Sequence, residues 1–140
     1  MARIGSRAAS ADAPASLNDA LSGIRVLDFT QVGAGPTCGM LLGDLGAEVI
    51  KIEAPGGDIG RRLGPPWQAG ESVVSMSFNR NKRSLALDLK NARGPGVVER
   101  LAAQADVVLE SFRPGVMDKL GIGYAALSPK CPRIVYCSVS

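Results

Sequence analysis

The sequence predicts an α/β fold in which a parallel sheet is flanked by helices. Short apolar runs of strand length alternate with amphipathic stretches over residues 21–140, and turns rich in glycine and proline separate them. Alternation of this kind is typical of βαβ units, and no internal repeat interrupts it. The 140 residues are enough for one domain with a buried core. We therefore expect a Rossmann-like sheet over residues 21–140.

The first expected unit is a strand, a turn and a helix. The strand is "GIRVLDF" at residues 23–29, a glycine-rich turn follows, and "AEVIKIE" at 47–53 is the second strand. Helical spacing predicts one apolar face made of Cys38, Leu41, Leu42 and Leu45. Glycines recur every four residues on another face, at Gly35, Gly39 and Gly43. Because glycine weakens a helix, we expect a strand, a partner chain or a ligand to approach closely there.

The rest of the chain continues the alternation. Residues 54–72 form a long loop rich in glycine and proline, and loops of that length are usually functional or mobile. The later elements are a strand around Leu85–Leu89, a helix over 92–104, a strand over 105–111, two short helices within 113–128 and a strand over 132–140. A parallel sheet binds its ligands beyond the carboxyl ends of its strands, and the sequence stops just after its last strand. We therefore expect it to be the front part of a longer protein.

Composition argues against several classes of protein. The net charge is +3 and aromatic residues make up 4%, which is little for a nucleic-acid-binding surface. The chain has no histidine and its three cysteines form no Cys-x-x-Cys pair, so we expect no metal site, no disulfide framework and no Ser-His-Asp or Cys-His site. No apolar run approaches the roughly 20 residues of a membrane span.

Residues 1–20 differ from the rest in composition. They are rich in alanine and serine and carry Arg3 and Arg7, so they are expected to be a disordered tail or a targeting segment outside the fold. Reduced thiols favour a cytoplasmic protein, or a mitochondrial one if this segment is a transit peptide.

The turn after the first strand resembles a dinucleotide-binding fingerprint in part. Gly33 and Gly35 supply G-x-G, and Glu53 stands where a ribose-binding acid belongs. Cys38 replaces the third glycine, and Pro36 removes an N–H from the start of the helix. A Rossmann-type oxidoreductase therefore stays an alternative. The helix dipole could lower the pKa of the Cys38 thiol, but its place on the apolar helix face favours core packing.

Two later segments carry cations. "NRNKRS" at residues 79–84 could hold phosphates, or could be a solvated surface turn. After the strand over 105–111, the chain supplies an aromatic ring, a guanidinium and an ammonium group, which suit an adenine and its phosphates. These residues are Ser111, Phe112, Arg113 and Lys119. A capped surface turn explains the same segment.

Four blocks, in this order and spacing, resemble the amino-terminal part of the family III coenzyme A transferases. They are "LSGIRVLDFTQVGAGPTCGMLLGDLGAEVIKIEAPGGD", "NRNKRSLALDLK", "ADVVLESFRPGVMDKLGIGY" and "PRIVYCSVS". The family includes formyl-CoA:oxalate and carnitine CoA-transferases, succinyl-CoA-dependent dicarboxylate transferases and α-methylacyl-CoA racemases. The resemblance implies an incomplete Rossmann-like domain of a longer chain, which forms an interlocked homodimer and binds acyl-CoA and a carboxylic acid.

The resemblance also implies contacts with coenzyme A at three segments. These are Val32, Gly33 and Ala34; Leu87, Asp88, Leu89 and Lys90; and Ser111, Phe112, Arg113 and Lys119. Some members place an arginine just after the second strand, where this chain has Ala54.

The transferases use an aspartate nucleophile, which the resemblance places beyond Ser140. None of the acids at Asp28, Asp44, Glu53, Asp58 and Asp88 matches it. Asp28 and Asp88 are expected inside strands, where they would fix loops, and Glu53 is expected simply to end a strand. Within the family, the loop "GRRLGPPWQAGES" at residues 60–72 and the segment "NRNKRS" resemble those of dicarboxylate-type transferases more than those of racemases. A racemase fragment and a non-catalytic module that binds CoA or a nucleotide are the alternatives.

Overall fold

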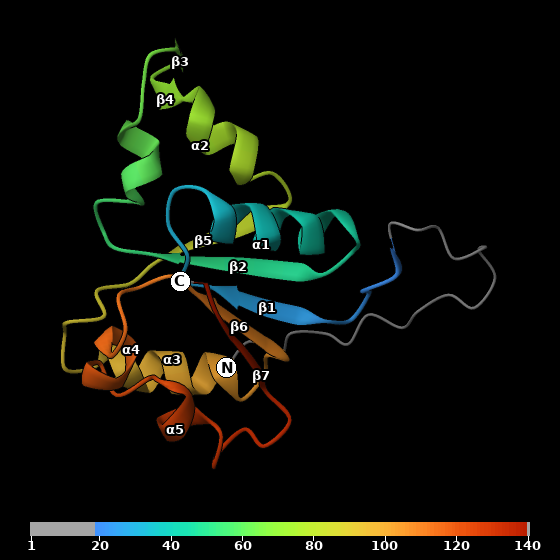
Figure 1. Cartoon of the computed structure of the whole chain (residues 1–140), viewed down its shortest axis with the longest axis vertical. Helices are drawn as coiled ribbons and strands as arrows, with labels where there is room; N and C mark the ends of the chain where they lie inside the picture. The colour runs from blue at the N-terminus through green and yellow to red at the C-terminus, as the bar shows by residue number, and fades with distance from the viewer. Residues whose placement is uncertain (1–18, 140) are drawn as a thin grey trace, which may run out of the picture.

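The computed structural model describes residues 19–139, and a parallel five-stranded sheet forms its centre (Figure 1). The strand order is β5-β2-β1-β6-β7, the order of a Rossmann fold. The strands are β1 (Arg25–Asp28), β2 (Glu48–Glu53), β5 (Lys82–Ala86), β6 (Val107–Glu110) and β7 (Val135–Ser138). Val26 of β1 is in register with Val49 and Val107 on its two sides. The expected α/β fold with a parallel sheet is confirmed.

Helices cover both faces of this sheet (Figure 1). We call the side of α1 (Ala34–Asp44) and α2 (Val73–Phe78) the α1 face. The opposite side, the α3 face, carries α3 (Gly94–Ala102), α4 (Val116–Lys119) and α5 (Tyr124–Leu127). Right-handed crossovers between parallel strands produce such a two-sided cover.

The two faces have separate cores. On the α3 face, buried residues from the strands pack against the helices, among them Leu27, Phe29, Val98, Val108, Ile122 and Leu127. The core of the α1 face is smaller and consists of Val26, Ala47, Val49 and Leu109, with Cys38 and Leu42 packed against it. Successive strand residues point to opposite faces, which explains why Val26 and Leu27 belong to different cores.

The glycine side of α1 faces the sheet together with Leu42, whereas Leu41 does not. A Cβ atom at Gly39 would lie 2.6 Å from the Asp28 carboxylate, so β1 is the element that approaches this helix closely. Leu41 is 52% exposed and Leu45 is 40% exposed. The expected apolar face is therefore wrong for these two residues, because the helix turns its small residues towards the strand.

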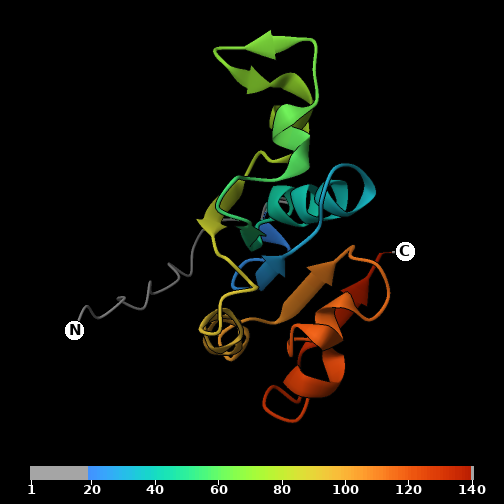
Figure 2. The same cartoon turned by 90° about the vertical axis from the view of Figure 1, so that its left-hand side faces the viewer.

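Residues 54–81 form an arm that stands away from the sheet (Figure 2). The arm contains the 3₁₀ helix η2 (Ile59–Arg62), the hairpin strands β3 (Trp67–Gln68) and β4 (Glu71–Ser72), and α2. Ser72 links its parts, because its hydroxyl donates to the Leu63 carbonyl and accepts from the Ser75 amide. The segment expected as a long loop is thus largely ordered, and α2 follows it.

Other boundaries differ from the expectation by a few residues. β5 ends at Ala86, so residues 87–90 lie in a turn and Asp88 is outside the strand. The expected helix over 92–104 is confirmed as α3, two residues shorter at each end. The expectation of a tail or targeting segment over residues 1–20 falls mostly on residues 1–18, which lie outside the described part. Within residues 19–139, no helix is long and apolar enough to span a membrane.

Candidate functional site

The sheet order creates a crevice between the carboxyl ends of β1 and β6. The chain leaves β1 towards α1 on one face, and leaves β6 towards α4 on the other. Ligands of open α/β sheets bind where the loops separate in this way. One hydrogen bond joins the two loops, since the Gln31 amide donates to the Ser111 hydroxyl at 3.0 Å. The predicted segments Val32–Ala34 and Ser111–Arg113 therefore meet at this crevice.

The loop after β1 is strained at Val32. This β-branched residue adopts φ 68°, in the left-handed region that such side chains rarely occupy, and its side chain is exposed. Observed strain of this kind often marks a functional loop. Asp28 holds the start of the loop, because its Oδ1 atom accepts the Thr30 amide at 2.9 Å. The expectation that Asp28 lies in a strand and fixes a loop is confirmed.

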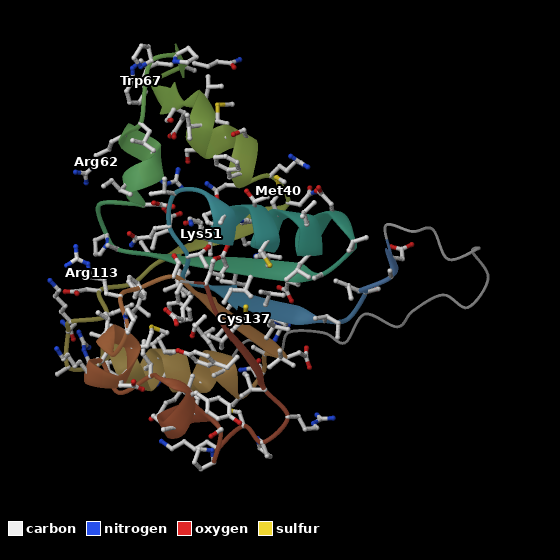
Figure 3. The ribbon with its side chains drawn as sticks, viewed as in Figure 1. Met40, Lys51, Arg62, Trp67, Arg113 and Cys137 are labelled. Carbon is white, nitrogen blue, oxygen red and sulfur yellow. The ribbon has the colours of Figure 1, made fainter. Side chains whose placement is uncertain are left out.

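The loop after β6 presents two free cations. Arg113 and Lys119 are exposed, and neither has an ion-pair partner among residues 19–139. The Phe112 amide donates to the buried Glu110 carboxylate at 2.9 Å, which fixes the turn. Phe112 and Arg113 line an open cavity of about 330 Å³. In Figure 3, Arg113 and Arg62 lie on the same side of the molecule, beyond the end of β2.

Tyr136 also lines this cavity, and sequence reasoning did not single it out. Its hydroxyl is buried without a hydrogen-bond partner among the described residues. Burial raises the pKa of this phenol, and the carboxylates of Glu110 and Asp118 raise it further. The group is therefore a neutral donor that a ligand could satisfy.

The third predicted segment, residues 87–90, lies at the same edge of the sheet after β5. The Leu87 amide donates to the Glu53 carbonyl at 2.7 Å and extends the pairing of β5 with β2. The Asp88 carboxylate accepts the Lys90 amide at 2.9 Å, so Asp88 fixes the turn. Leu89 is half-buried against the α3-face core. The Lys90 side chain is exposed and has no ion-pair partner within the described chain.

Buried charges lie beneath the carboxyl ends of β1 and β2, and Lys82 reaches them from the first position of β5. Lys82 Nζ lies 2.8 Å from Asp28 Oδ2 and donates to the Pro36 carbonyl. Burial lowers the pKa of the Lys82 ammonium, and the Asp28 carboxylate acts in the opposite direction. Lys51 Nζ lies 2.9 Å from Asp58 Oδ2 and donates to the Thr30 carbonyl at 2.8 Å. These lysines thus connect the first loop, α1 and the arm to the strands.

Glu53 joins the arm to β2 and β5. Its carboxylate accepts four hydrogen bonds, two from the Arg61 guanidinium and one each from Asp58 and Ser84. The Arg61 guanidinium lowers the pKa of Glu53 to about 2, against an ordinary value of 4.5, although burial opposes the shift. Glu53 is thus more than the end of a strand. The sequence held a signal for this ion pair, because an acid at the end of a strand is followed shortly by the arginine pair Arg61-Arg62.

The cations of the segment "NRNKRS" are paired with carboxylates of the fold. Arg80 pairs with Asp44 at 2.6 Å, Arg83 pairs with Glu48 at 2.7 Å, and Lys82 is buried beside Asp28. The Arg80 guanidinium lowers the pKa of Asp44, and Arg25 together with Arg83 lowers the pKa of Glu48. Of the two interpretations of this segment, the ion pairs favour a turn that is bound to the fold's own carboxylates over a phosphate-binding turn.

Cys38 packs into the core of the α1 face. Burial raises the pKa of its thiol, and Cys137 and Asp28 raise it further. The core position is confirmed, and the raised pKa disfavours a thiolate there. Among residues 19–139, no group of three or more cysteine, aspartate or glutamate side chains is arranged to hold a metal ion.

Comparison with known proteins identifies the family. Residues 21–140 match the sequence pattern described as CoA-transferase family III. The chain belongs to this family. It is 49% identical over 121 residues to the succinyl-CoA:glutarate CoA-transferase of Mus musculus. The matched residues are 86% of this chain and 28% of that relative. It is 42% identical over 121 residues to the formyl-CoA:oxalate CoA-transferase of Afipia carboxidovorans, with the same two shares covered.

Solved structures share the fold of this family III CoA-transferase chain. A CAIB/BAIF family protein from Brucella suis superposes with a TM-score of 0.82 at 41% identity, over 86% of this chain and 33% of that one. The protein Rv3272 from Mycobacterium tuberculosis gives a TM-score of 0.78 at 48% identity, over 84% and 32%. The chain therefore spans about a third or less of the length of these relatives.

Proposed function

We propose that this chain is the CoA-binding part of a transferase that moves CoA from an acyl-CoA donor to a carboxylic acid. One observation carries the proposal: three loops after β1, β5 and β6 meet the same edge of the sheet, and two of them present unpaired cations. CoA is a polyanion with an adenine ring, so such an edge offers both charge and contact surface.

Each segment has a distinct role in this proposal. The main chain at Val32–Ala34 lies against the cofactor, since glycine allows a close approach. Arg113 and Lys119 bind phosphate oxygens, and Arg113 can do so with a two-pronged guanidinium. Phe112 supplies an aromatic surface beside them. Residues 87–90, after β5, contact the cofactor from another part of the same sheet edge, where Lys90 adds a further positive charge.

The nucleophile belongs outside the described residues in this proposal. A family III transferase of this type uses an aspartate that takes the acyl group as a mixed anhydride and then becomes an aspartyl-CoA thioester, which divides a difficult exchange into easier steps. The buried carboxylates of Asp28, Glu53 and Asp58 each have cationic partners and cannot swing towards a substrate. Asp44 and Asp88 hold Arg80 and the turn after β5. We place the nucleophile beyond Ser140.

The names of the relatives favour a dicarboxylic acceptor. They include a succinyl-CoA:glutarate transferase and a succinyl-CoA--L-malate transferase β subunit from Chloroflexus aurantiacus, 45% identical over 121 residues. We propose a similar acceptor here, in an interlocked homodimer of the cytoplasm or mitochondrion.

Calorimetric titration with CoA and, separately, with NAD tests the proposal. We expect CoA to bind and NAD not to bind. Replacing two phosphate contacts, in Arg113→Ala with Lys119→Ala, should weaken CoA binding by about 10- to 100-fold, since a charge-assisted hydrogen bond contributes a few kcal/mol at most. The loss should shrink as salt is added.

The control is Lys130→Ala with Arg133→Ala, which removes the same charge near the amino end of β7. It should leave CoA affinity unchanged. Preferential NAD binding, or equal affinities in both double variants, would refute the proposed site.

A further inference from the structure

A separate open cavity of about 570 Å³ lies where the loop after β5 meets the start of α3. Leu87 and Asp88 form one wall, and they belong to the third of the segments proposed to contact CoA. Arg93, Gly96 and Arg100 of the α3 region form the other wall. A volume of this size is ordinary for a small-molecule site. Through Leu87 and Asp88, the cavity therefore adjoins the proposed CoA edge.

Two arginines face this cavity without a carboxylate partner. Arg93 precedes α3 and Arg100 lies about two helical turns later, so both side chains fall on one side of the helix. Both are exposed, and neither forms an ion pair within residues 19–139. Asp88 is the acid on the lining, and its Oδ1 atom already accepts the Lys90 amide. The cavity thus keeps an excess of unpaired positive charge.

The backbone adds room for an anion beside these arginines. The nine-residue α3 has no side-chain cap and no acidic residue in its first turn, and Pro95 in that turn has no N–H to donate, so an anion here depends on the arginine side chains. A Cβ atom at Gly96 would meet nothing within 4 Å, so the space in front of this turn is open. At Gly94, by contrast, a Cβ would lie 2.6 Å from the Asp88 carbonyl oxygen. The close contact at Gly94 holds the two walls together and the open space at Gly96 leaves the cavity accessible.

We propose that this cavity binds the 3′-phosphorylated ribose of CoA, and that Arg93 and Arg100 are the residues that recognise its 3′-phosphate. The inference rests on the proposed function, because residues 87–90 must contact CoA for the phosphate to arrive here. A guanidinium binds phosphate through two parallel hydrogen bonds, and a pair of them on one helix side can hold both faces of the group. Recognition of this phosphate would separate CoA from 3′-dephospho-CoA and from NAD.

The test compares the dissociation constants of CoA and 3′-dephospho-CoA in four proteins: the wild type, Arg93→Gln with Arg100→Gln, Gly96→Leu, and Arg133→Gln as a control. The wild type should prefer CoA by about 10- to 100-fold, as expected for loss of a charge-assisted phosphate contact. In the double arginine variant the preference should fall to about threefold or less, with the affinity for 3′-dephospho-CoA unchanged. Arg133, at the amino end of β7, should have no effect.

Gly96→Leu tests the same cavity without removing a charge. The open space at Gly96 accepts a side chain, so the variant should fold with an unchanged melting temperature and yet lose most of the preference for CoA. Retention of the wild-type preference in both variants overturns the inference and leaves the proposed function standing. If the wild type binds neither ligand, both the inference and the proposed function are wrong.

Discussion

The two faces of the sheet are stabilised by different interactions. On the α3 face, Leu27 and Val108 are fully buried against Val98 and Leu127 of the helices. On the α1 face, β1 and β2 carry apolar residues such as Val26 near their amino ends and charged residues near their carboxyl ends, and β5 adds a lysine at its amino end. The charged residues are Asp28, Lys51, Glu53 and Lys82, whose side chains are almost completely buried.

This difference follows the position of the candidate site. Apolar burial stabilises a fold without fixing the direction of any one contact, whereas hydrogen-bonded ion pairs fix particular atoms. These buried charges lie next to the loop after β1 and the arm. Lys51 donates a hydrogen bond to the Thr30 carbonyl in that loop and forms an ion pair with Asp58 in the arm. We infer that the buried charges of the α1 face position the loop after β1 and the arm, whereas the core of the α3 face stabilises the fold through apolar contacts.

The largest expected effect comes from breaking the pair between Lys82 and Asp28. Lys82→Met should lower the free energy of unfolding by about 3–5 kcal/mol, because it leaves a buried carboxylate without a counter-ion. The variant also removes the donor to the Pro36 carbonyl. Urea unfolding followed by circular dichroism measures the loss.

A second variant separates the lost charge from the lost packing. Lys82→Met combined with Asp28→Asn removes both charges and keeps an acceptor for the Thr30 amide. It should recover about 1–2 kcal/mol of the loss, since a buried polar group is less costly than a buried charge. Equal stability of the single and the double variant would show that the pair does not organise this face.

The acid dependence of stability depends on Glu53. Its pKa is about 2 in the folded protein and near 4.5 in the unfolded chain, so its stabilising contribution is complete above about 4.5 and disappears as the pH falls towards about 2. At neutral pH this contribution is about 2–3 kcal/mol. Urea unfolding of the wild type and of Glu53→Gln, measured from pH 7 to pH 2, should give curves that converge at the acid end.

Parallel curves over that range would show that Glu53 does not hold the arm. Asp44 and Glu48 titrate in both proteins, so only the difference between the two curves reports on Glu53.

Hydrophobic spacing predicted the order of the strands and helices correctly, because strand and helix periods differ clearly in Val107–Glu110 and Gly94–Ala102. It failed for α1, where the same spacing placed Leu41 and Leu45 in the core. The glycines of that helix admit Asp28 so closely that the helix must turn its glycine side to the strand. The spacing of apolar residues carries no information about this close approach between a glycine and a carboxylate, so it could not predict which side of the helix faces the strand.

The site shows a similar division between local and distant information. The three predicted segments share one edge because parallel strands end together, which follows from the fold alone. The partners of Glu53 and Lys82 lie 8 and 54 residues away, so their burial could not be read from local sequence. The two interpretations of residues 79–84 stayed open for the same reason, since the carboxylates that pair with their cations belong to β1, α1 and β2.

The smallest expected effect comes from an ion pair on the α3 face that resembles the buried one in geometry. Lys130 Nζ lies 2.6 Å from Glu99 Oε1, which is shorter than the distance between Lys82 and Asp28. Yet the Lys130 side chain is 59% exposed, whereas that of Lys82 is 1% exposed. Lys130→Met should therefore change the free energy of unfolding by about 0.5 kcal/mol or less, and the change should vanish in 1 M salt. Urea unfolding at low and high salt gives the comparison with Lys82→Met, whose cost should persist in salt because the pair is buried. A loss of similar size in both variants would mean that distance, and not burial, determines what an ion pair contributes to this fold.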